Sequence, residues 1–477
     1  MLKTLNRRPG QPLYLQIHQQ IRDLIRVGDL STGTRLPSER ELALLLGVNR
    51  TTVSKAYQEL FADGLIERQV GRGTVVCPIL DEEDVYPLPW SDYFATIGRQ
   101  SQDPLQELFI SPDQDFIPLS YGVPDPDLRP IERFAEAADR ILRRHGASAF
   151  EFSPVEAFKE ILAQWMIEQG GRATPDNILP LTGAQQGLDL LARAFITPGD
   201  SVVVEKPTYI NAVGTFREAG ARFIEIPVDE DGMRIDILER VLRQHRPRLI
   251  YTMPTFQNPS GFVMSLERRQ ALIALAQRYQ IPIIEENPYS QFYDEVPPPP
   301  SLKSLDRGGH VIYLSTFSNT VFPGMRLGWM VAPQPVIRRL ETIKQFVDMY
   351  SSTFFQWIMV EFIQQGWLIE HLDKVRPIYT QRRRAMLDAL EQYIDEGLQW
   401  HKPTGGFFIW CHLEDHFRAK DFLIEAKQQH LFFVIGEPFH ANHSGQETFR
   451  LSFAYHNEMV IQEGIRRLGE ALRIFRA

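Results

Sequence analysis

Short apolar runs alternate with helical stretches along most of this chain, from about residue 116 onward. The clearest strand-like runs lie at 201–205, 248–252, 281–285 and 311–314. Parallel strands need a crossover connection, which is usually a helix, so this alternation predicts an α/β domain with a mostly parallel sheet and helices on both faces. A small C-terminal α+β subdomain is expected from about residue 370, after a long helical region.

The first 77 residues show another pattern, in which three short helices precede a hairpin. Ser38 and Glu41 have the spacing of a capping box before one helix, and Asn49 can cap the next. Glycines at 28, 47 and 64 interrupt the helical spacing, and strand-like runs at 65–68 and 73–76 flank a turn at 71–73. The acidic run 81–84 and the prolines after it read as a linker. Because 477 residues exceed what one core usually holds, we expect separate domains at 1–77 and 116–477, with the linker at 78–115.

The net charge of −9 is unevenly distributed. Residues 1–76 carry 11 Lys and Arg against 7 Asp and Glu, so a basic head precedes an acidic body. This asymmetry predicts that any contact with phosphates is made by the head. The 2 cysteines lack metal-site spacing, and the sequence shows neither a transmembrane run nor a signal peptide. A cytoplasmic protein without membrane contact is therefore expected.

Residues 12–76 resemble the GntR-type winged helix-turn-helix. The resemblance rests on RLPSERELA at 35–43, NRTTV at 49–53 and GRGT at 71–74. It implies binding to double-stranded operator DNA, with the start of the helix near Arg50 meeting base edges in the major groove. A homodimer is expected because one winged head binds weakly and such sites are usually paired. The candidate DNA-binding residues are Arg40, Arg50, Thr51, Thr52, Ser54, Lys55 and Arg72.

Residues 117–475 resemble the fold-type I aminotransferases that use pyridoxal 5′-phosphate (PLP), and the two parts together resemble the MocR subfamily of GntR regulators. The matching motifs are TGAQQ at 182–186, EKPTY at 205–209, PTFQNPSG at 254–261, EENPY at 285–289, TFSNTVFPGMRLG at 316–328 and FRLSF at 449–453. The resemblance implies a cofactor phosphate held by Gly183, Ala184, Gln185, Thr316, Ser318 and Arg326. It implies ring contacts from Tyr209, Asn258, Glu286 and Tyr289, and an effector carboxylate held by Arg450.

Three departures from that family bear on the chemistry. Asn319 stands where the family has the lysine that forms a Schiff base with PLP, and an amide is neither nucleophilic nor basic. Glu286 replaces the family's aspartate and reaches one methylene further, and the turn at 150–154 lacks the tyrosine and glycine found in many relatives. These changes predict a degenerate domain that is not an enzyme and does not hold PLP covalently.

The sequence therefore predicts a DNA-binding transcriptional regulator whose body senses a small effector that is anionic, PLP-related or amino-acid-like. PLP or a PLP-like molecule is the cofactor that the resemblance implies, bound without a covalent link. Two alternatives stay open. One is a PLP-dependent aminotransferase with an accessory DNA-binding head, and the other is a regulator whose body is a scaffold without a ligand. For each charged residue of the head, a solvated surface is the alternative role.

Overall fold

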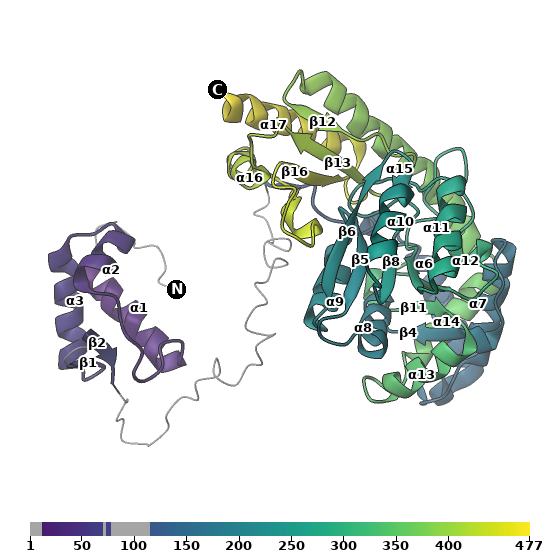
Figure 1. The fold of residues 1–477 in the computed structure, drawn as a ribbon, viewed down its shortest axis with the longest axis horizontal. Helices are drawn as coiled ribbons and strands as arrows, with labels where there is room; N and C mark the ends of the chain where they lie inside the picture. The colour runs from purple at the N-terminus through teal and green to yellow at the C-terminus, as the bar shows by residue number, and fades with distance from the viewer. Residues whose placement is uncertain (1–11, 70–72, 78–114) are drawn as a thin grey trace. The chain divides into compact units, whose positions relative to one another are not determined.

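The computed structural model describes residues 12–69, 73–77 and 115–477 (Figure 1). Contacts between residues divide the chain into two compact units, Met1–Asp103 and Pro104–Ala477, which we describe separately as the head and the body. Apart from Asp115, the linker predicted at 78–115 lies outside the described residues. The domain limits drawn from the sequence stay a prediction.

The head contains the predicted three helices and hairpin. Its elements are α1 (Leu13–Val27), α2 (Glu39–Leu46), α3 (Arg50–Ala62), β1 (Ile66–Gln69) and β2 (Gly73–Val76). The predicted capping box is present before α2, where the Ser38 side chain accepts from the Glu41 amide and the Glu41 carboxylate accepts from the Ser38 amide. Asn49 caps α3 by accepting from the Thr51 amide at 3.2 Å. Local capping chemistry therefore determines where both helices of the motif begin.

Apolar side chains from all three helices fill the head's core, including Ile17, Ile21, Val53, Ala56 and Leu60. Strands β1 and β2 pair antiparallel and pack beneath this core through Ile66 and Val76. Of the turn predicted at 71–73, the structure describes Gly73, whose φ of 87° favours glycine.

The body is built on an eight-stranded sheet with the order β4-β11-β10-β9-β8-β5-β6-β7. Strands β5, β6, β8, β9 and β10 run parallel, whereas β11 and β7 are antiparallel to their neighbours. The strands are β4 (Ile178–Leu181), β5 (Ser201–Lys206), β6 (Arg222–Asp229), β7 (Gly232–Met233), β8 (Leu249–Thr252), β9 (Ile283–Glu286), β10 (Val311–Thr316) and β11 (Gly328–Val331). The predicted mostly parallel sheet is confirmed, with antiparallel strands placed among the parallel ones.

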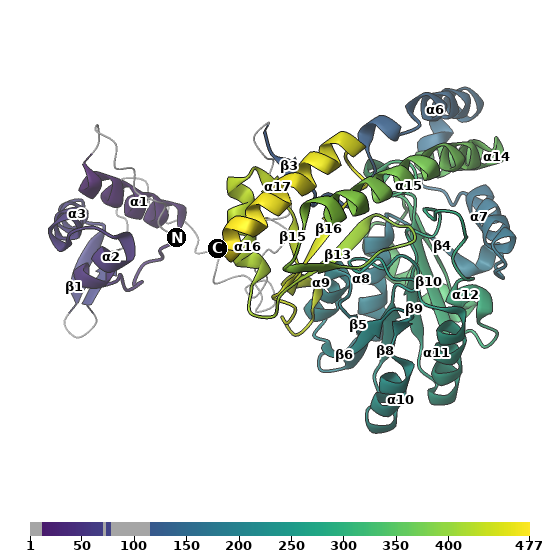
Figure 2. The same ribbon diagram turned by 90° about the horizontal axis from the view of Figure 1, so that it is seen from above.

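Helices cover both faces of this sheet (Figures 1 and 2). Along β5, Val202 and Val204 pack into one core while Val203 packs into the other, as the alternation of side chains on a strand requires. One face is covered by α10 (Ile235–Gln244), α11 (Leu266–Tyr279) and α12 (Leu302–Leu305). The other is covered by α6 (Ile131–His145), α7 (Glu156–Glu168), α8 (Ala184–Phe195), α9 (Ile210–Glu218), α13 (Gln334–Gln345) and α14 (Thr353–Gln364).

The helix α15 (Trp367–Tyr393) leads into the small C-terminal α+β portion predicted from about residue 370. Its antiparallel sheet has the order β12-β13-β16-β15 and packs against α16 (Ala419–Gln428) and α17 (Glu458–Arg476). The strands are β12 (Leu398–Trp400), β13 (Phe408–Leu413), β15 (Val434–Ile435) and β16 (Thr448–Ser452). Strand β3 (Ile117–Pro118) pairs with β14 (Leu431–Phe432), so the start of the body completes this portion.

None of the helices among the described residues is both long and apolar enough to span a bilayer.

Candidate functional site

The N-terminal end of α3 presents most of the head's predicted DNA-binding residues. Arg50 is the first residue of this helix, and Arg50, Thr51 and Lys55 are exposed, whereas Thr52 and Ser54 are half-buried. Arg40, on α2, is also exposed. Exposure at the start of a helix is what contact with base edges requires. Arg72 lies outside the described residues, so its predicted role is neither supported nor opposed.

Two of these charged side chains have partners within the head. The Arg50 Nε donates to the Glu39 carboxylate at 3.3 Å. The Lys55 ammonium lies 4.1 Å from the centre of the Tyr14 ring, a cation–π contact between α3 and α1. Both side chains are thus held on the surface of the head by contacts that sequence analysis did not anticipate.

In the body, most of the predicted site residues lie at or just after the carboxyl ends of the sheet's parallel strands. The segment at Gly183 follows β4, Tyr209 follows β5, Asn258 follows β8, and Glu286 ends β9. Thr316 ends β10. Open α/β sheets bind ligands at this edge, because the loops there converge outside the strand ends. The fold therefore brings residues that are distant in sequence to one region.

The turn at Gly183 opens directly onto helix α8. Gly183 has φ 80° and caps the helix without a side-chain hydrogen bond, so the first amides of α8 point toward the loop region. A Cβ added at Gly183 would lie 2.5 Å from an Nη atom of Arg326, so no other residue fits there unless the arginine moves. The Gln185 side chain turns toward α9, where it donates to Thr215 at 2.7 Å. Gly183 thus lies against Arg326, while Gln185 is engaged elsewhere.

The loop after β10 gathers the other three predicted phosphate ligands. The Thr316 hydroxyl lies 2.9 Å from the Ser318 hydroxyl, and Arg326 donates to that hydroxyl through Nη1 at 3.3 Å. Arg326 is exposed and has φ 49°, a left-handed conformation that is uncommon for a residue with a side chain. Two hydroxyls, a guanidinium and a helix N-terminus therefore converge, a set of donors suited to a dianion such as phosphate.

Glu286 is buried at the opposite end of the site. Its carboxylate accepts a hydrogen bond of 2.6 Å from the hydroxyl of Tyr251 on β8. Burial raises the pKa of Glu286 to about 7, although the tyrosine hydrogen bond opposes that shift. The longer glutamate side chain therefore has a protein partner and can change its charge near neutral pH.

Tyr289 and Tyr209 lie within electrostatic reach of Glu286. Burial raises the pKa of Tyr289, and hydrogen bonds to the side chains of Asn258 and Asn319 act in the opposite direction. The half-buried Tyr209 accepts a hydrogen bond from Asn211 at 3.0 Å, and burial followed by the charge of Glu286 raises its pKa. The structure thus brings Asn319 within hydrogen-bonding distance of the predicted ring-contacting group.

Arg450 on β16 is buried and joins this group from the small subdomain. Its Nη1 donates to the Asn258 side chain at 2.7 Å, and its Nη2 donates to the Ser120 carbonyl at 2.9 Å. The guanidinium carbon lies 4.2 Å from the Phe408 ring centre. Its Nε has no hydrogen-bond partner among the described residues. Burial lowers the pKa of Arg450 to about 10, so it remains charged and suited to an anionic partner.

Several residues that shape the site carry no recognisable signal in the sequence. Tyr251 looked like a core residue because it lies inside an apolar strand. Ser120 contributes through its carbonyl oxygen, which no side-chain pattern reveals. Asp348 accepts a hydrogen bond of 2.7 Å from Thr182 and so steadies the Gly183 turn, and no motif surrounds it. Residue 122 is a glycine because the Phe408 ring lies close to its backbone, and a Cβ there would lie 2.9 Å from that ring.

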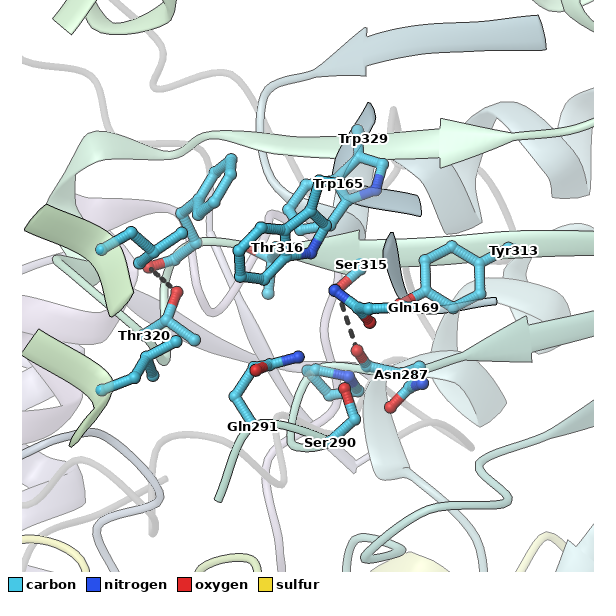
Figure 3. A pocket seen from close by; sticks show the side chains of 14 residues that line it. Trp165, Gln169, Asn287, Ser290, Gln291, Tyr313, Ser315, Thr316, Thr320 and Trp329 are labelled. Atoms are coloured by element: carbon cyan, nitrogen blue, oxygen red, sulfur yellow. Dashed lines mark hydrogen bonds between the residues drawn. The ribbon is translucent and has the colours of Figure 1, made fainter. Parts of the chain in front are cut away.

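A small cavity is lined in part by Thr316, one of the predicted site residues (Figure 3). Its volume is about 20 Å³, and the Ser315 hydroxyl donates to the Asn287 carbonyl beside it at 2.8 Å. The Asn287 Oδ1 and Trp329 Nε1 atoms in its lining are buried without a hydrogen-bond partner among the described residues. A polar space of this size suits one water molecule, so we do not assign it to an effector.

Two family models match the chain. Residues 114–468 match "Aminotransferase class I and II". Residues 13–76 match "Bacterial regulatory proteins, gntR family".

Relatives of two kinds cover the chain. An uncharacterized HTH-type transcriptional regulator, YisV, from Bacillus subtilis is 33% identical and covers 98% of this chain and 97% of its own length. Aromatic-amino-acid aminotransferase 1 from Thermococcus litoralis is 37% identical over 81% of this chain and 95% of its own length. The crystal structure of the α-aminoadipate aminotransferase LysN from Thermus thermophilus, with N-(5′-phosphopyridoxyl)-L-leucine, superimposes with a TM-score of 0.76 at 35% identity. That alignment covers 81% of this chain and 99% of LysN.

Proposed function

This chain belongs to the class I and II aminotransferase family and is a GntR-type regulator fused to an aminotransferase-like domain, and we propose that it acts as a MocR-type transcriptional regulator that senses a small anionic effector. Its head is proposed to bind paired sites in operator DNA through Arg40, Arg50, Thr51, Thr52, Ser54, Lys55 and Arg72. The exposure of the α3 N-terminus supports this role. The similarity to HTH-type regulators over nearly the whole chain supports it as well.

The proposal for the body rests on a difference between the anion-binding donors of its site and the residue at position 319. The phosphate-facing donors at Gly183, Ser318 and Arg326 converge, while Asn319 occupies the loop between them. We propose that Asn319 stands at the family's Schiff-base lysine position. Its amide cannot attack a carbonyl carbon or transfer protons as an amine does. The body is therefore proposed to bind its ligand without a covalent link and without turnover.

The residues present fit one end of PLP better than the other. The Gly183 turn fits a phosphate because a side chain there would overlap Arg326, and Thr316 and Ser318 supply hydroxyls beside it. When bound, PLP supplies an electron-withdrawing ring, but this chain lacks an amine at residue 319 to use it. Pyridoxamine phosphate, non-covalent PLP and a preformed PLP–amino acid adduct are the ligand classes that this arrangement favours.

Arg450 is proposed to bind the carboxylate of the effector. It is buried, it stays charged, and its Nε has no partner among the described residues. An adduct that carries both a phosphate and a carboxylate would engage Arg326 and Arg450 together. LysN, which is similar in fold, binds such an adduct. Ligand binding is proposed to change operator affinity because the ligand favours one of two states of the protein.

A homodimer is proposed on the basis of an apolar surface on the body. Phe152 is 76% exposed and Phe346 is 87% exposed in the single chain. Nearby, the Phe150 and Phe354 rings stack with centroids 4.7 Å apart. The Phe152 ring in turn lies 6.4 Å from the ring of Tyr350, four residues after Phe346. Contiguous exposed apolar patches mark protein–protein interaction sites. The segment that carries Phe346 also carries Asp348, which binds Thr182 beside the Gly183 turn.

Two measurements on the full-length protein test the proposed function. In the first, duplexes are selected from a random library and the selected DNA is footprinted, and two half-sites are expected. In the second, the protein is mixed with PLP, treated with borohydride and weighed intact. No added PLP mass is expected, whereas trapped PLP would mean that another lysine has taken the role and would overturn the non-covalent proposal.

The aromatic-amino-acid aminotransferase similarity favours one competing function, an enzyme with an accessory DNA-binding head. Turnover of an amino acid by the pure protein with PLP would establish it. Selection of an operator without any thermal shift from phosphate-bearing ligands would instead favour a ligand-free scaffold body.

A further inference from the structure

Three elements of the head meet at one carboxylate. Glu39, the first residue of α2, accepts from Arg50 Nε on α3 at 3.3 Å through Oε2. Its other oxygen accepts from Arg68 Nη2 on β1 at 3.4 Å. Glu39 therefore joins the start of the helix proposed to read bases to β1, one strand of the β1–β2 hairpin, which we call the wing. Neither Glu39 nor Arg68 belongs to the DNA-binding set derived from the sequence.

The backbone around Glu39 is held firmly from both sides. The capping box restrains Ser38 and Glu41. The buried Tyr57 donates from its hydroxyl to the Pro37 carbonyl at 2.8 Å, which ties α3 to the residues just before α2. These hydrogen bonds hold the backbone of Glu39 in a defined position relative to α3.

The burial of the three side chains is unequal. The Glu39 side chain is 18% exposed, whereas those of Arg50 and Arg68 are 71% and 74% exposed. The carboxylate is covered while the two guanidinium groups lie outward, and two positive charges against one negative leave the cluster net positive. Arg50 uses Nε for this contact, so the bond to Glu39 does not occupy its terminal Nη atoms, which are suited to a guanine edge.

Such exposed ion pairs add little to stability, so their effect lies in the orientation they impose. A free arginine samples many rotamers, and holding it in one of them lowers the entropy cost of binding. Arg68 is restrained a second time, because its guanidinium carbon lies 5.5 Å from the Phe61 ring centre. Both arginines are therefore preorganised by groups of the head itself.

We propose that Glu39 is a positioning residue that holds Arg50 for reading a base edge, and that Arg68 is a further DNA-binding residue that contacts a flanking phosphate. Arg50 lies at a helix N-terminus, where base contacts are made, and Arg68 lies on the wing, which follows the backbone. This inference rests on the proposed DNA-binding function and adds to it the means by which specificity is set.

The test uses the full-length protein and duplexes selected from a random library. For Glu39→Gln, the ratio of affinity for the selected site to affinity for random duplex is expected to fall by about 10-fold, because Arg50 loses its orientation. The motif selected by this variant is expected to lose information at the base that Arg50 reads. Affinity for random duplex is expected to stay equal or rise, since a negative charge is removed. Glu39→Asp, which keeps the carboxylate, is expected to recover part of the ratio.

Glu67→Gln is the matched control because it removes one exposed carboxylate from the same strand as Arg68. If it and Glu39→Gln strengthen binding to all duplexes equally and leave the motif intact, Glu39 acts only by charge and the positioning role is wrong. Circular dichroism and thermal unfolding of each variant confirm that the head is folded.

Arg68→Ala is expected to weaken binding to all sequences and to lower the slope of log affinity against log salt by about 1, as loss of one phosphate contact does. Arg26→Ala, an exposed arginine at the end of α1, is its charge-matched control. Equal slopes for both variants would overturn the role of Arg68. If the unmodified protein selects no motif at all, the proposed function itself fails and this inference fails with it.

Discussion

At the phosphate end of the body's site, Ser318 and Arg326 converge on a helix N-terminus that opens at Gly183. At the other end, Glu286 is bonded to Tyr251 and Asn319 supplies an amide. The first region offers donors suited to an anion, and the second offers a carboxyl group, a phenol and an amide. The two regions therefore differ in the chemistry of their side chains, and the proposed non-covalent sensing depends on that difference.

Placing an amine at residue 319 should remove this difference and produce the largest effect. Asn319→Lys is expected to bind PLP covalently, because the new amine would enter a site whose phosphate-facing donors are already arranged. The measurement is the intact mass after treatment with PLP and borohydride, with complete labelling expected for the variant and none for the wild type. Asn319→Gln is the control that adds length without an amine. Equal labelling of both variants would show that the attachment lies elsewhere.

A substitution at the proposed phosphate-binding turn should weaken ligand binding without changing the residues proposed to contact the ring. Gly183→Ala is expected to reduce affinity for pyridoxamine phosphate by roughly 10- to 100-fold, since the new Cβ would collide with Arg326 and the backbone would be strained. Gly199→Ala is the matched control, because Gly199 also has positive φ, 96°, but no atom within 4 Å of the added Cβ. Isothermal titration of both variants separates the collision from the strain, and equal losses would argue against the phosphate assignment.

A smaller effect is expected at Arg450. This residue is proposed to bind the carboxylate of a ligand but not its phosphate, so two ligands that differ in the carboxylate test its role. Arg450→Lys loses the paired donors to Asn258 and Ser120. Affinity for N-(5′-phosphopyridoxyl)-L-leucine is expected to fall by about 10-fold, while affinity for pyridoxamine phosphate, which has no carboxylate, should change little. A similar loss for both ligands would mean that Arg450 supports the fold of the site rather than binding a carboxylate.

The last prediction concerns the pH dependence of stability at Glu286, a buried group that is expected to affect the melting temperature more than ligand binding. Its pKa rises from 4.5 to about 7 on folding. Below pH 4.5 the carboxyl group is neutral in both the folded and the unfolded chain, and its contribution to the free energy of unfolding is at its largest. This contribution is lost as the pH rises toward 7, because the unfolded chain releases the proton first. Glu286→Gln keeps an acceptor for Tyr251 and cannot ionise. The melting temperature of the variant relative to wild type should therefore rise across this window, and a constant difference would contradict the shifted pKa.

Local chemistry made much of the head and the positions of several of the body's strands predictable. The Ser38–Glu41 capping box and the Asn49 cap depend on residues within three positions of each other, so a sequence displays them directly. The strands at 201–205 and 311–314 were found within two residues of their ends because apolar runs of that length are distinctive. Strand β9 begins at Ile283 rather than at residue 281, since Pro282 has no amide hydrogen for the ladder.

Other contacts could not be found in this way because they join residues far apart in the chain. Glu286 meets Tyr251 across neighbouring parallel strands, and Asn258 meets Arg450 across 192 positions. Glu39 joins Arg50 and Arg68 because the packing of α2 against α3 and the wing brings them together. None of these pairs has a periodicity or spacing that marks it in the sequence.

The sequence by itself determined which functional groups are available, including an amide rather than an amine at residue 319, because the group that a side chain carries is fixed by the residue type. It also determined the helix starts and the alternation of strands and helices, which arise from interactions between near neighbours. Only the tertiary structure decided that Glu286 is paired with Tyr251 and holds its proton to about pH 7, and that Arg450 is buried but charged. Those properties depend on burial and on distant partners, and both come into being only when the chain packs.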